Sequence, residues 1–152
     1  MPDYHLLTEL LGLPHVQVTH YQLVGAERIN LLVESTLPAA ICPDCQQVSV
    51  AVHETGEPQF LRDLPLWQRR CWLGYAPRRF KCTGCSDTFV ERVVWREPGL
   101  GYTQRYEHSL YERMRREPVA QVARIEGLTE EAAQGIFERR AKKASPTGAT
   151  RS

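Results

Sequence analysis

Hydrophobic and polar residues alternate along much of the N-terminal part of the chain, which is the pattern of half-buried β-strands. Two such runs, Val16–Leu23 and Arg28–Glu34, are separated by a glycine-containing segment, Val24–Glu27, that predicts a turn. An amphipathic segment before them, Tyr4–Leu11, predicts a helix of one or two turns that ends at Gly12. The chain is therefore expected to begin with a short helix and two consecutive strands.

Further strand-like runs follow at short intervals. One is centred on Val48–His53, and another, Thr88–Glu91, has the alternation of a closing strand. Between them, the stretch Trp67–Lys81 combines aromatic residues with arginine and predicts one or two strands, broken near Gly74 or Pro77. The region up to this point therefore reads as mostly β.

The periodicity becomes helical from Tyr102 onward. Pro118 suits the first turn of a second helix, which is expected to stop at Gly127, and Thr129 is a favourable N-cap for a third. Apolar residues at helical spacing mark the expected inner faces of the three helices: Tyr106, Leu110, Met114, Val119, Val122, Ala123, Ala133, Ile136, Phe137 and Ala141.

These patterns predict an α+β protein with two domains. Pro98-Gly99, together with Gly101, interrupts the pattern and places the boundary there. We expect a small β-rich domain over residues 1–97, a three-helix domain over 98–144, and a tail without structure over 145–152.

The charge of the chain is small overall but unevenly distributed. The 152 residues carry a formal net charge of +1. Residues 1–61 hold seven acids against one base, Arg28, whereas residues 62–152 hold 18 bases and 11 acids. Such asymmetry indicates nucleic acid or another polyanion as a partner of the second part.

The composition excludes some classes of protein. Hydrophobic residues make up 42% and charged residues 24% of the chain, so wholesale disorder is excluded. No apolar run approaches the roughly 18 residues of a membrane span, and the start lacks the features of a secretory signal. We therefore expect a soluble, cytoplasmic protein without a membrane partner.

Four of the five cysteines form two Cys-x-x-Cys pairs, Cys42/Cys45 and Cys82/Cys85, separated by 36 residues. Two such turns aim four thiolates at one point, which is the ligand set of a structural zinc site. Disulfides are disfavoured in a chain without a secretory signal, and a redox motif needs only one such pair. An iron–sulfur cluster is the remaining alternative, because sulfur ligands alone do not select the metal. The fifth cysteine, Cys71, is expected in the core.

The segment between the two cysteine pairs is rich in arginine and in aromatic residues. Arginine suits phosphate, and aromatic side chains such as Trp67 and Trp72 can pack against its plane. In the alternative interpretation the aromatics are core residues and the arginines are solvated or offset the charge of the thiolates. The candidate DNA contacts in this segment are Arg69, Arg70, Arg78 and Arg79.

The three expected helices match a helix-turn-helix, whose last helix enters the major groove of DNA. Glu130 and Glu131 at the start of that helix would repel phosphate, and Gly135 within it costs about 1 kcal/mol relative to alanine. A helical bundle that contacts another protein is therefore the alternative. The candidate DNA contacts on this helix are Gln134, Glu138, Arg139, Lys142 and Lys143.

The motifs together resemble a known family. CPDC at 42–45, RDLP at 62–65, RRFKCTGC at 78–85 and TFVE at 88–91 resemble the N-terminal zinc-binding region of ISL3-family bacterial transposases. The helical segment resembles the helix-turn-helix that follows in that family. The resemblance implies one structural Zn²⁺ held by Cys42, Cys45, Cys82 and Cys85, and double-stranded DNA as the partner.

In that family the two regions bind the terminal inverted repeats of an insertion sequence, and a DDE-type catalytic domain follows. Only eight residues follow Ala144 here, so we expect DNA binding in transposition without catalysis by this chain. An independent nuclease built on Asp63, Glu91 and Glu97 is poorly supported. The alternative is an interaction module that associates with itself or with an intact transposase and limits its activity.

Overall fold

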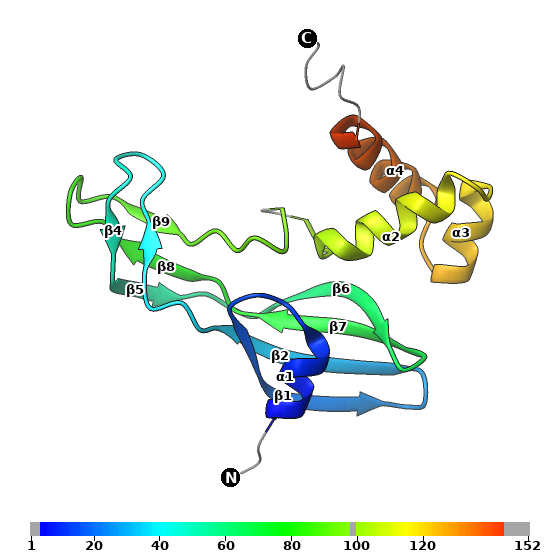
Figure 1. Ribbon diagram of the computed structural model, residues 1–152, viewed down its shortest axis with the longest axis horizontal. Helices are drawn as coiled ribbons and strands as arrows, with labels where there is room; N and C mark the ends of the chain where they lie inside the picture. The colour runs from blue at the N-terminus through cyan, green and yellow to red at the C-terminus, as the bar shows by residue number, and fades with distance from the viewer. Residues whose placement is uncertain (1–3, 98–99, 145–152) are drawn as a thin grey trace. The chain divides into compact units, whose positions relative to one another are not determined.

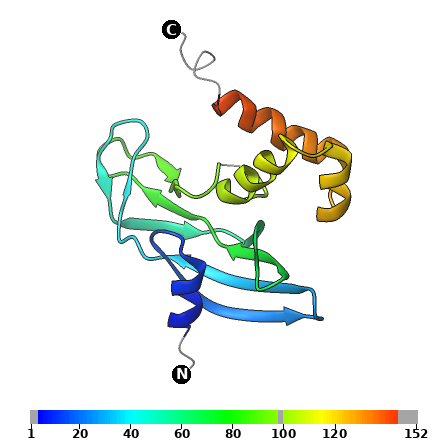
Figure 2. The same ribbon diagram turned by 45° about the vertical axis from the view of Figure 1, so that its right-hand side comes forward.

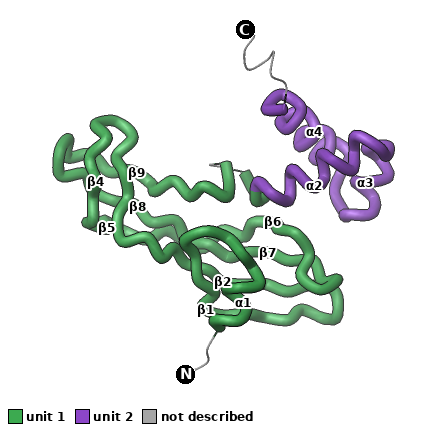
Figure 3. The backbone as a smooth tube through the Cα atoms, in the orientation of Figure 1, with its two compact units in different colours: residues 1–103 green, residues 104–152 purple. Residues whose placement is uncertain are grey.

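The computed structural model describes residues 4–97 and 100–144, which form two compact units (Figures 1 and 3). Unit 1 spans residues 1–103 and unit 2 spans residues 104–152. The described residues contain nine strands and four helices, which confirms the expected α+β class. The proposed boundary dipeptide, Pro98-Gly99, and the proposed tail over 145–152 lie outside the described residues.

Unit 1 carries one helix and all nine strands (Figure 1). The elements, in chain order, are α1 His5–Leu11, β1 Val16–Val24, β2 Arg28–Ser35, β3 Ala40–Ile41, β4 Val48–Ser49, β5 Ala51–Thr55, β6 Gln59–Leu66, β7 Arg69–Tyr75, β8 Arg78–Lys81 and β9 Thr88–Val90.

Four of these strands form one sheet in the order β1-β2-β7-β6 (Figure 2). The β1–β2 and β6–β7 pairs are antiparallel hairpins, whereas β2 and β7 run parallel. The sheet is therefore two hairpins joined edge to edge along β2 and β7.

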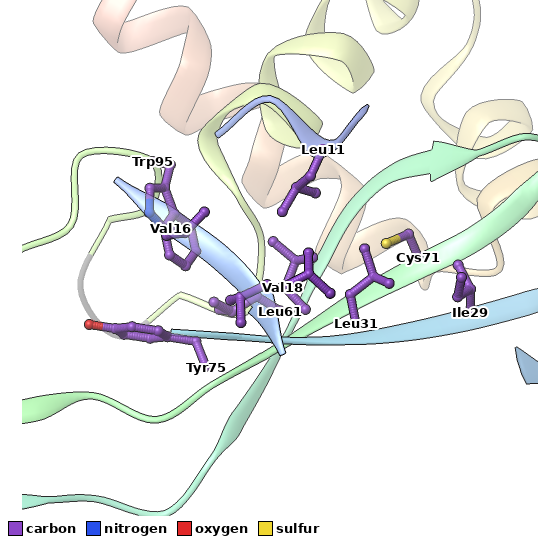
Figure 4. Close-up of a cluster of buried hydrophobic side chains, with 11 residues drawn as sticks. Leu11, Val16, Val18, Ile29, Leu31, Leu61, Cys71, Tyr75 and Trp95 are labelled. Carbon is purple, nitrogen blue, oxygen red and sulfur yellow. The ribbon is translucent and has the colours of Figure 1, made fainter. Parts of the chain in front are cut away.

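The hydrophobic core of unit 1 lies on one face of this sheet (Figure 4). Alternate residues of β2 and β7 are paired across the strands and buried, for example Leu31 opposite Leu73 and Ile29 opposite Cys71. Leu11 from α1 and Trp95 from the segment after β9 belong to the same cluster. Burying each large side chain contributes about 1.5–3 kcal/mol, so this face supplies much of the stability of the unit.

The remaining strands build a second, smaller substructure, which we call the ribbon. It consists of a two-stranded sheet, β3-β4, and a three-stranded sheet, β5-β8-β9. The chain alternates between the two substructures. It leaves the four-stranded sheet after β2, builds β3 to β5, returns for β6 and β7, and then adds β8 and β9.

Two details of the predicted strands needed correction. The strand expected around Val48–His53 is two strands, β4 and β5. The break in Trp67–Lys81 falls between Tyr75 and Arg78, at Pro77, and Gly74 lies inside β7. A side chain at Gly74 would need Leu32 to shift, because an added Cβ would lie 2.5 Å from one of its methyl carbons.

Unit 2 is the expected three-helix arrangement, with α2 Gln104–Met114, α3 Val119–Glu126 and α4 Glu130–Ala144. Its buried apolar side chains are those that the helical spacing marked: Tyr106, Leu110, Met114, Val122, Ala123, Ala133 and Ile136. Within the described residues, no helix is both long enough and apolar enough to span a membrane.

Candidate metal centre and nucleic-acid interface

The two Cys-x-x-Cys segments fold into turns with the same hydrogen bonds. In the first, the backbone N–H of Cys42 donates to the carbonyl of Gln47 at 2.9 Å, and that of Gln46 donates to the carbonyl of Cys42 at 2.9 Å. In the second, Cys82 donates to Asp87 at 2.8 Å and Ser86 donates to Cys82 at 3.1 Å. The residue after the second cysteine of each turn has the same left-handed backbone, with φ of 66° at Gln46 and Ser86.

The strands bring the two turns together. The first turn joins β3 to β4 and the second joins β8 to β9. The hydroxyl of Ser49 at the end of β4 donates to the carbonyl of Lys81 at the end of β8, which ties the two hairpins side by side. Phe80 and Phe89, whose ring centroids are 6.0 Å apart, pack with Cys42 and Cys82 in a small core.

The four sulfur atoms converge on one point. The Sγ atoms of Cys42 and Cys85 are 3.7 Å apart, those of Cys45 and Cys82 are 3.3 Å apart, and all four lie within 4.8 Å of one another. A tetrahedral zinc ion with Zn–S bonds of about 2.3 Å requires sulfur–sulfur distances of about 3.8 Å. The cluster therefore fits one structural Zn²⁺.

The backbone around the cluster favours the thiolate form of one ligand. The N–H of Gly84 donates to the sulfur of Cys82 at 3.3 Å. Hydrogen bonds from the backbone of Cys85 and Gly84 lower the pKa of the Cys82 thiol to about 7. Metal binding requires deprotonated thiols, and Cys82 is the ligand of this turn that the backbone prepares, since burial and the neighbouring thiols raise the pKa of Cys85.

The arginines proposed from the sequence as DNA contacts have different surroundings. Arg78 donates to the buried carboxylate of Glu91, with nitrogen–oxygen distances of 2.6 and 2.7 Å, and to Ser35 and the carbonyl of Leu37. The hydrogen bond to Glu91 raises the pKa of Arg78. The hydroxyl of Tyr75 donates to the same carboxylate at 2.9 Å, and burial raises the pKa of that tyrosine. Arg78 thus connects the ribbon to the four-stranded sheet.

Arg79 lies on β8 beside a cavity of about 370 Å³. The cavity is also lined by Arg92 and by Arg96, whose pKa burial lowers. The other two proposed arginines, Arg69 and Arg70, begin β7. Arg70 is exposed, Arg69 is half-buried, and the Nε atom of Arg69 has no hydrogen-bond partner.

In unit 2, α3 and α4 are joined by a tight turn. Gly127, at φ 72°, ends α3 in the left-handed conformation, and the N–H of Leu128 donates to the carbonyl of Ala123 at 2.8 Å. The hydroxyl of Thr129 accepts a hydrogen bond from the N–H of Ala132 at 3.0 Å and caps α4. The helix-turn-helix geometry therefore follows from the glycine and threonine that the sequence indicated.

The proposed DNA contacts on α4 separate into two groups. Gln134, Glu138, Lys142 and Lys143 are exposed, and Gln134 donates to Glu138 at 3.2 Å. Arg139 instead donates to the carboxylate of Glu107 on α2 at 2.6 Å.

Glu107 is a structural residue that the sequence did not reveal. Its side chain is 3% exposed, and Arg140 lies 3.5 Å from its other carboxylate oxygen. Glu107 therefore holds α4 against α2 through two consecutive arginines. Its place next to Tyr106 on the inner face of α2 is the signal that could have identified it, since a carboxylate buried there needs a partner.

A ribbon with four converging thiols and a helix-turn-helix together are the architecture of a zinc-containing DNA-binding protein. Two family models match the chain: the zinc-finger of transposase IS204/IS1001/IS1096/IS1165 over residues 38–85, and the helix-turn-helix domain of transposase family ISL3 over residues 91–141. The chain therefore belongs to the ISL3 family of transposases, of which it carries these two DNA-binding regions. Neither matched region is a catalytic domain. Comparisons with curated proteins and with solved structures gave no match.

Proposed function

We propose that this chain recognises the terminal inverted repeats of an ISL3-type insertion sequence as duplex DNA at the bacterial nucleoid, and that it supplies binding rather than catalysis. The observation that carries the proposal is the exposed face of α4, which follows the tight turn of a helix-turn-helix. In this motif the second helix of the pair reads base edges in the major groove.

The exposed face of α4 has the chemistry for reading bases. Gln134, Glu138 and Lys142 follow one another at intervals of four residues and therefore share a face. Glutamine can pair with adenine through two hydrogen bonds, glutamate can accept from the amino group of cytosine, and lysine suits phosphate or guanine. Gly135, between the first two, leaves room for the helix to approach the floor of the groove.

The zinc centre has a structural role in this proposal. Bound zinc supplies cross-links among the four thiolates and leaves no open coordination position for a reacting group. The residues around it keep the strands in place: Ser49 joins the two hairpins, Arg78 donates to Ser35 of β2, and Glu91 accepts from Tyr75 of β7. Arg69, Arg70 and Arg79 are the proposed phosphate contacts of unit 1, and Lys143 extends the basic end of α4.

The test is a fluorescence anisotropy titration of the zinc-loaded full chain with labelled duplexes carrying either the element's terminal repeat or a scrambled sequence. We expect preference for the repeat and a steep loss of affinity with added salt. Gln134→Ala should weaken binding to the repeat by roughly 5- to 100-fold, the equivalent of one lost base contact, and leave the scrambled duplex unaffected. Gln17→Ala, an exposed glutamine on β1, is the matched control and should change neither.

Equal affinity for the two duplexes would contradict recognition of the repeat, and absence of binding by folded, zinc-containing protein at low salt would contradict DNA binding altogether. An equal effect of Gln134→Ala on the affinity for both duplexes would contradict base recognition by α4.

A second candidate function is association with another copy or with an intact transposase. The observation that favours it is β1, an edge strand of the four-stranded sheet with apolar side chains that are 51% exposed at Tyr21 and Leu23. An exposed apolar edge is a template for pairing with another strand. Sedimentation of the wild type against Leu23→Lys tests it: a dimer that the substitution dissociates supports this function, and a monomeric wild type contradicts self-association.

A further inference from the structure

The turn between β6 and β7 has an unusual sequence for its backbone. Leu66 pairs with Arg69, so the hairpin has a two-residue loop, Trp67-Gln68, with φ of 49° and 70°. Positive φ at both positions defines a type I′ turn, which strongly favours Asn-Gly because other side chains rarely adopt this conformation. A bulky tryptophan in the first position is strained, and strain of this kind is concentrated at functional sites.

The side chain of Trp67 does not stabilise the fold in return. It is 80% exposed, the largest exposed fraction among the large apolar side chains of the described residues. The other two tryptophans have clear structural roles, since Trp95 is 5% exposed in the core and Trp72 lies under the guanidinium of Arg28 at 3.8 Å. Trp67 therefore neither favours the turn conformation nor packs in the core.

The strand leading into the turn is also irregular. The β6–β7 register shifts between Asp63 and Leu66, where Leu64 and Pro65 interrupt the pairing. A bulge bends a strand and redirects the side chains beyond it. The sequence RDLP thus sets the direction of the hairpin tip that carries Trp67.

The surroundings of the tip are basic. Arg69 and Arg70 follow the turn directly, and Arg28 at the start of β2 lies opposite Arg70 in the β2–β7 strand register. The backbone N–H of Arg70 donates to the carbonyl of Glu27 at 2.8 Å, which places the β1–β2 turn at the same end of the sheet (Figure 1). Arg28, Arg69 and Arg70 thus place three basic side chains at this end of the sheet.

An exposed aromatic ring between arginines suits duplex DNA better than a second copy of the chain. Two identical basic tips repel each other in a symmetric contact. On DNA the arginines meet phosphates, and an aromatic or apolar side chain can pack into a groove or against a base step.

We propose that the β6–β7 tip is a second DNA-contacting element, in which Trp67 packs against the bases or sugars of a groove while Arg69 and Arg70 bind the flanking phosphates. This inference rests on the proposed function and extends it from the helix-turn-helix to the sheet of unit 1. The strained turn is retained because it presents the ring to DNA.

The test separates DNA contact from a structural role by a substitution that should improve the turn. The double variant that combines Trp67→Asn with Gln68→Gly gives the tip the two residues that a type I′ turn prefers. We expect the double variant to melt a few degrees higher than the wild type, yet to bind a labelled duplex of mixed sequence roughly tenfold more weakly. Trp67→Phe keeps an aromatic ring and should recover most of the affinity. Val94→Ala, at an exposed apolar residue elsewhere in unit 1, is the control and should bind as the wild type does.

Wild-type affinity in the double variant would overturn the inference, as would failure of Trp67→Phe to recover binding lost in Trp67→Ala. A wild type that binds no duplex would refute the proposed function itself, so the two failures are distinct. Loss of affinity with normal melting in Trp67→Ala and recovery in Trp67→Phe would support the contact.

Discussion

Cysteine residues in this chain occupy two chemically different environments. Cys42, Cys45, Cys82 and Cys85 converge within 4.8 Å of one another in two polar turns, whereas Cys71 is 1% exposed among apolar side chains on β7. A thiol in the first environment is a metal ligand, and a thiol in the second behaves as a small hydrophobic residue.

This difference predicts opposite results from the same substitution. Cys82→Ser should abolish binding of one zinc ion per chain, because three thiolates no longer complete the tetrahedral site. Cys71→Ser should retain one zinc ion and lower the free energy of unfolding by about 1–2 kcal/mol, because burying a hydroxyl costs more than burying a thiol. Metal analysis after gel filtration measures the first effect and urea denaturation the second. Loss of zinc from Cys71→Ser would contradict the assignment.

Single residues also show what could be predicted from the sequence. The four metal ligands follow from spacing alone, because each Cys-x-x-Cys turn is local. The partners of Arg78 and Arg139 do not, because the β8–β9 pairing brings Glu91 to Arg78 and the packing of α4 on α2 brings Glu107 to Arg139. Both arginines therefore read as free cations in the sequence, and only the structure shows their carboxylate partners.

Glycines at the ends and in the middle of helices have opposite roles in unit 2. Gly127 ends α3 at φ 72°, where a side chain is strained. Gly135 lies within α4, and an added Cβ would meet only a nitrogen of Arg139 at 3.5 Å, an ordinary contact distance. Gly135 is therefore not required for folding.

Alanine substitution at the two glycines should accordingly change stability in opposite directions. Gly135→Ala should raise the free energy of unfolding by about 1 kcal/mol, since alanine is the better helix former. Gly127→Ala should lower it by about 1 kcal/mol. Thermal unfolding followed by circular dichroism checks both. If α4 lies in the major groove, Gly135→Ala should also bind the terminal repeat more weakly despite its greater stability. Destabilisation by Gly135→Ala would show that its environment differs from that described.

At the scale of elements, the sequence predicted which segments form strands and helices more fully than how the strands pair. Alternation identified β1, β2 and β9, and capping residues identified α3 and α4. The parallel pairing of β2 with β7 joins segments far apart in the chain, and no local pattern encodes it. The split of Trp67–Lys81 at Pro77 was predicted as one of two alternatives, and Gly74, the other, lies within β7 opposite Leu32.

The whole molecule consists of two units with separate hydrophobic cores, and the four thiols belong to only one of them. Structural zinc contributes about 10–16 kcal/mol in zinc-finger peptides, so its removal should affect the unit that holds it far more than the other.

Chelation should therefore loosen the two units unequally. Excess chelator should increase hydrogen exchange in β3, β4, β5, β8 and β9, while the amides of α2, α3 and α4 keep their protection. Mass spectrometry of peptides after exchange measures this, and readdition of zinc is the control for reversibility. Equal loss of protection in both units would mean that the helices depend on the metal.

The alternation of the chain between the four-stranded sheet and the ribbon has an evolutionary consequence. The segment between the two cysteine pairs contributes β6 and β7 to a sheet whose other strands, β1 and β2, precede the first pair. A recombination event that transferred only the segment bounded by the four cysteines would carry half of that sheet without its partner. We therefore expect exchange of DNA-binding parts among insertion sequences to involve unit 1 as a whole rather than its zinc centre alone.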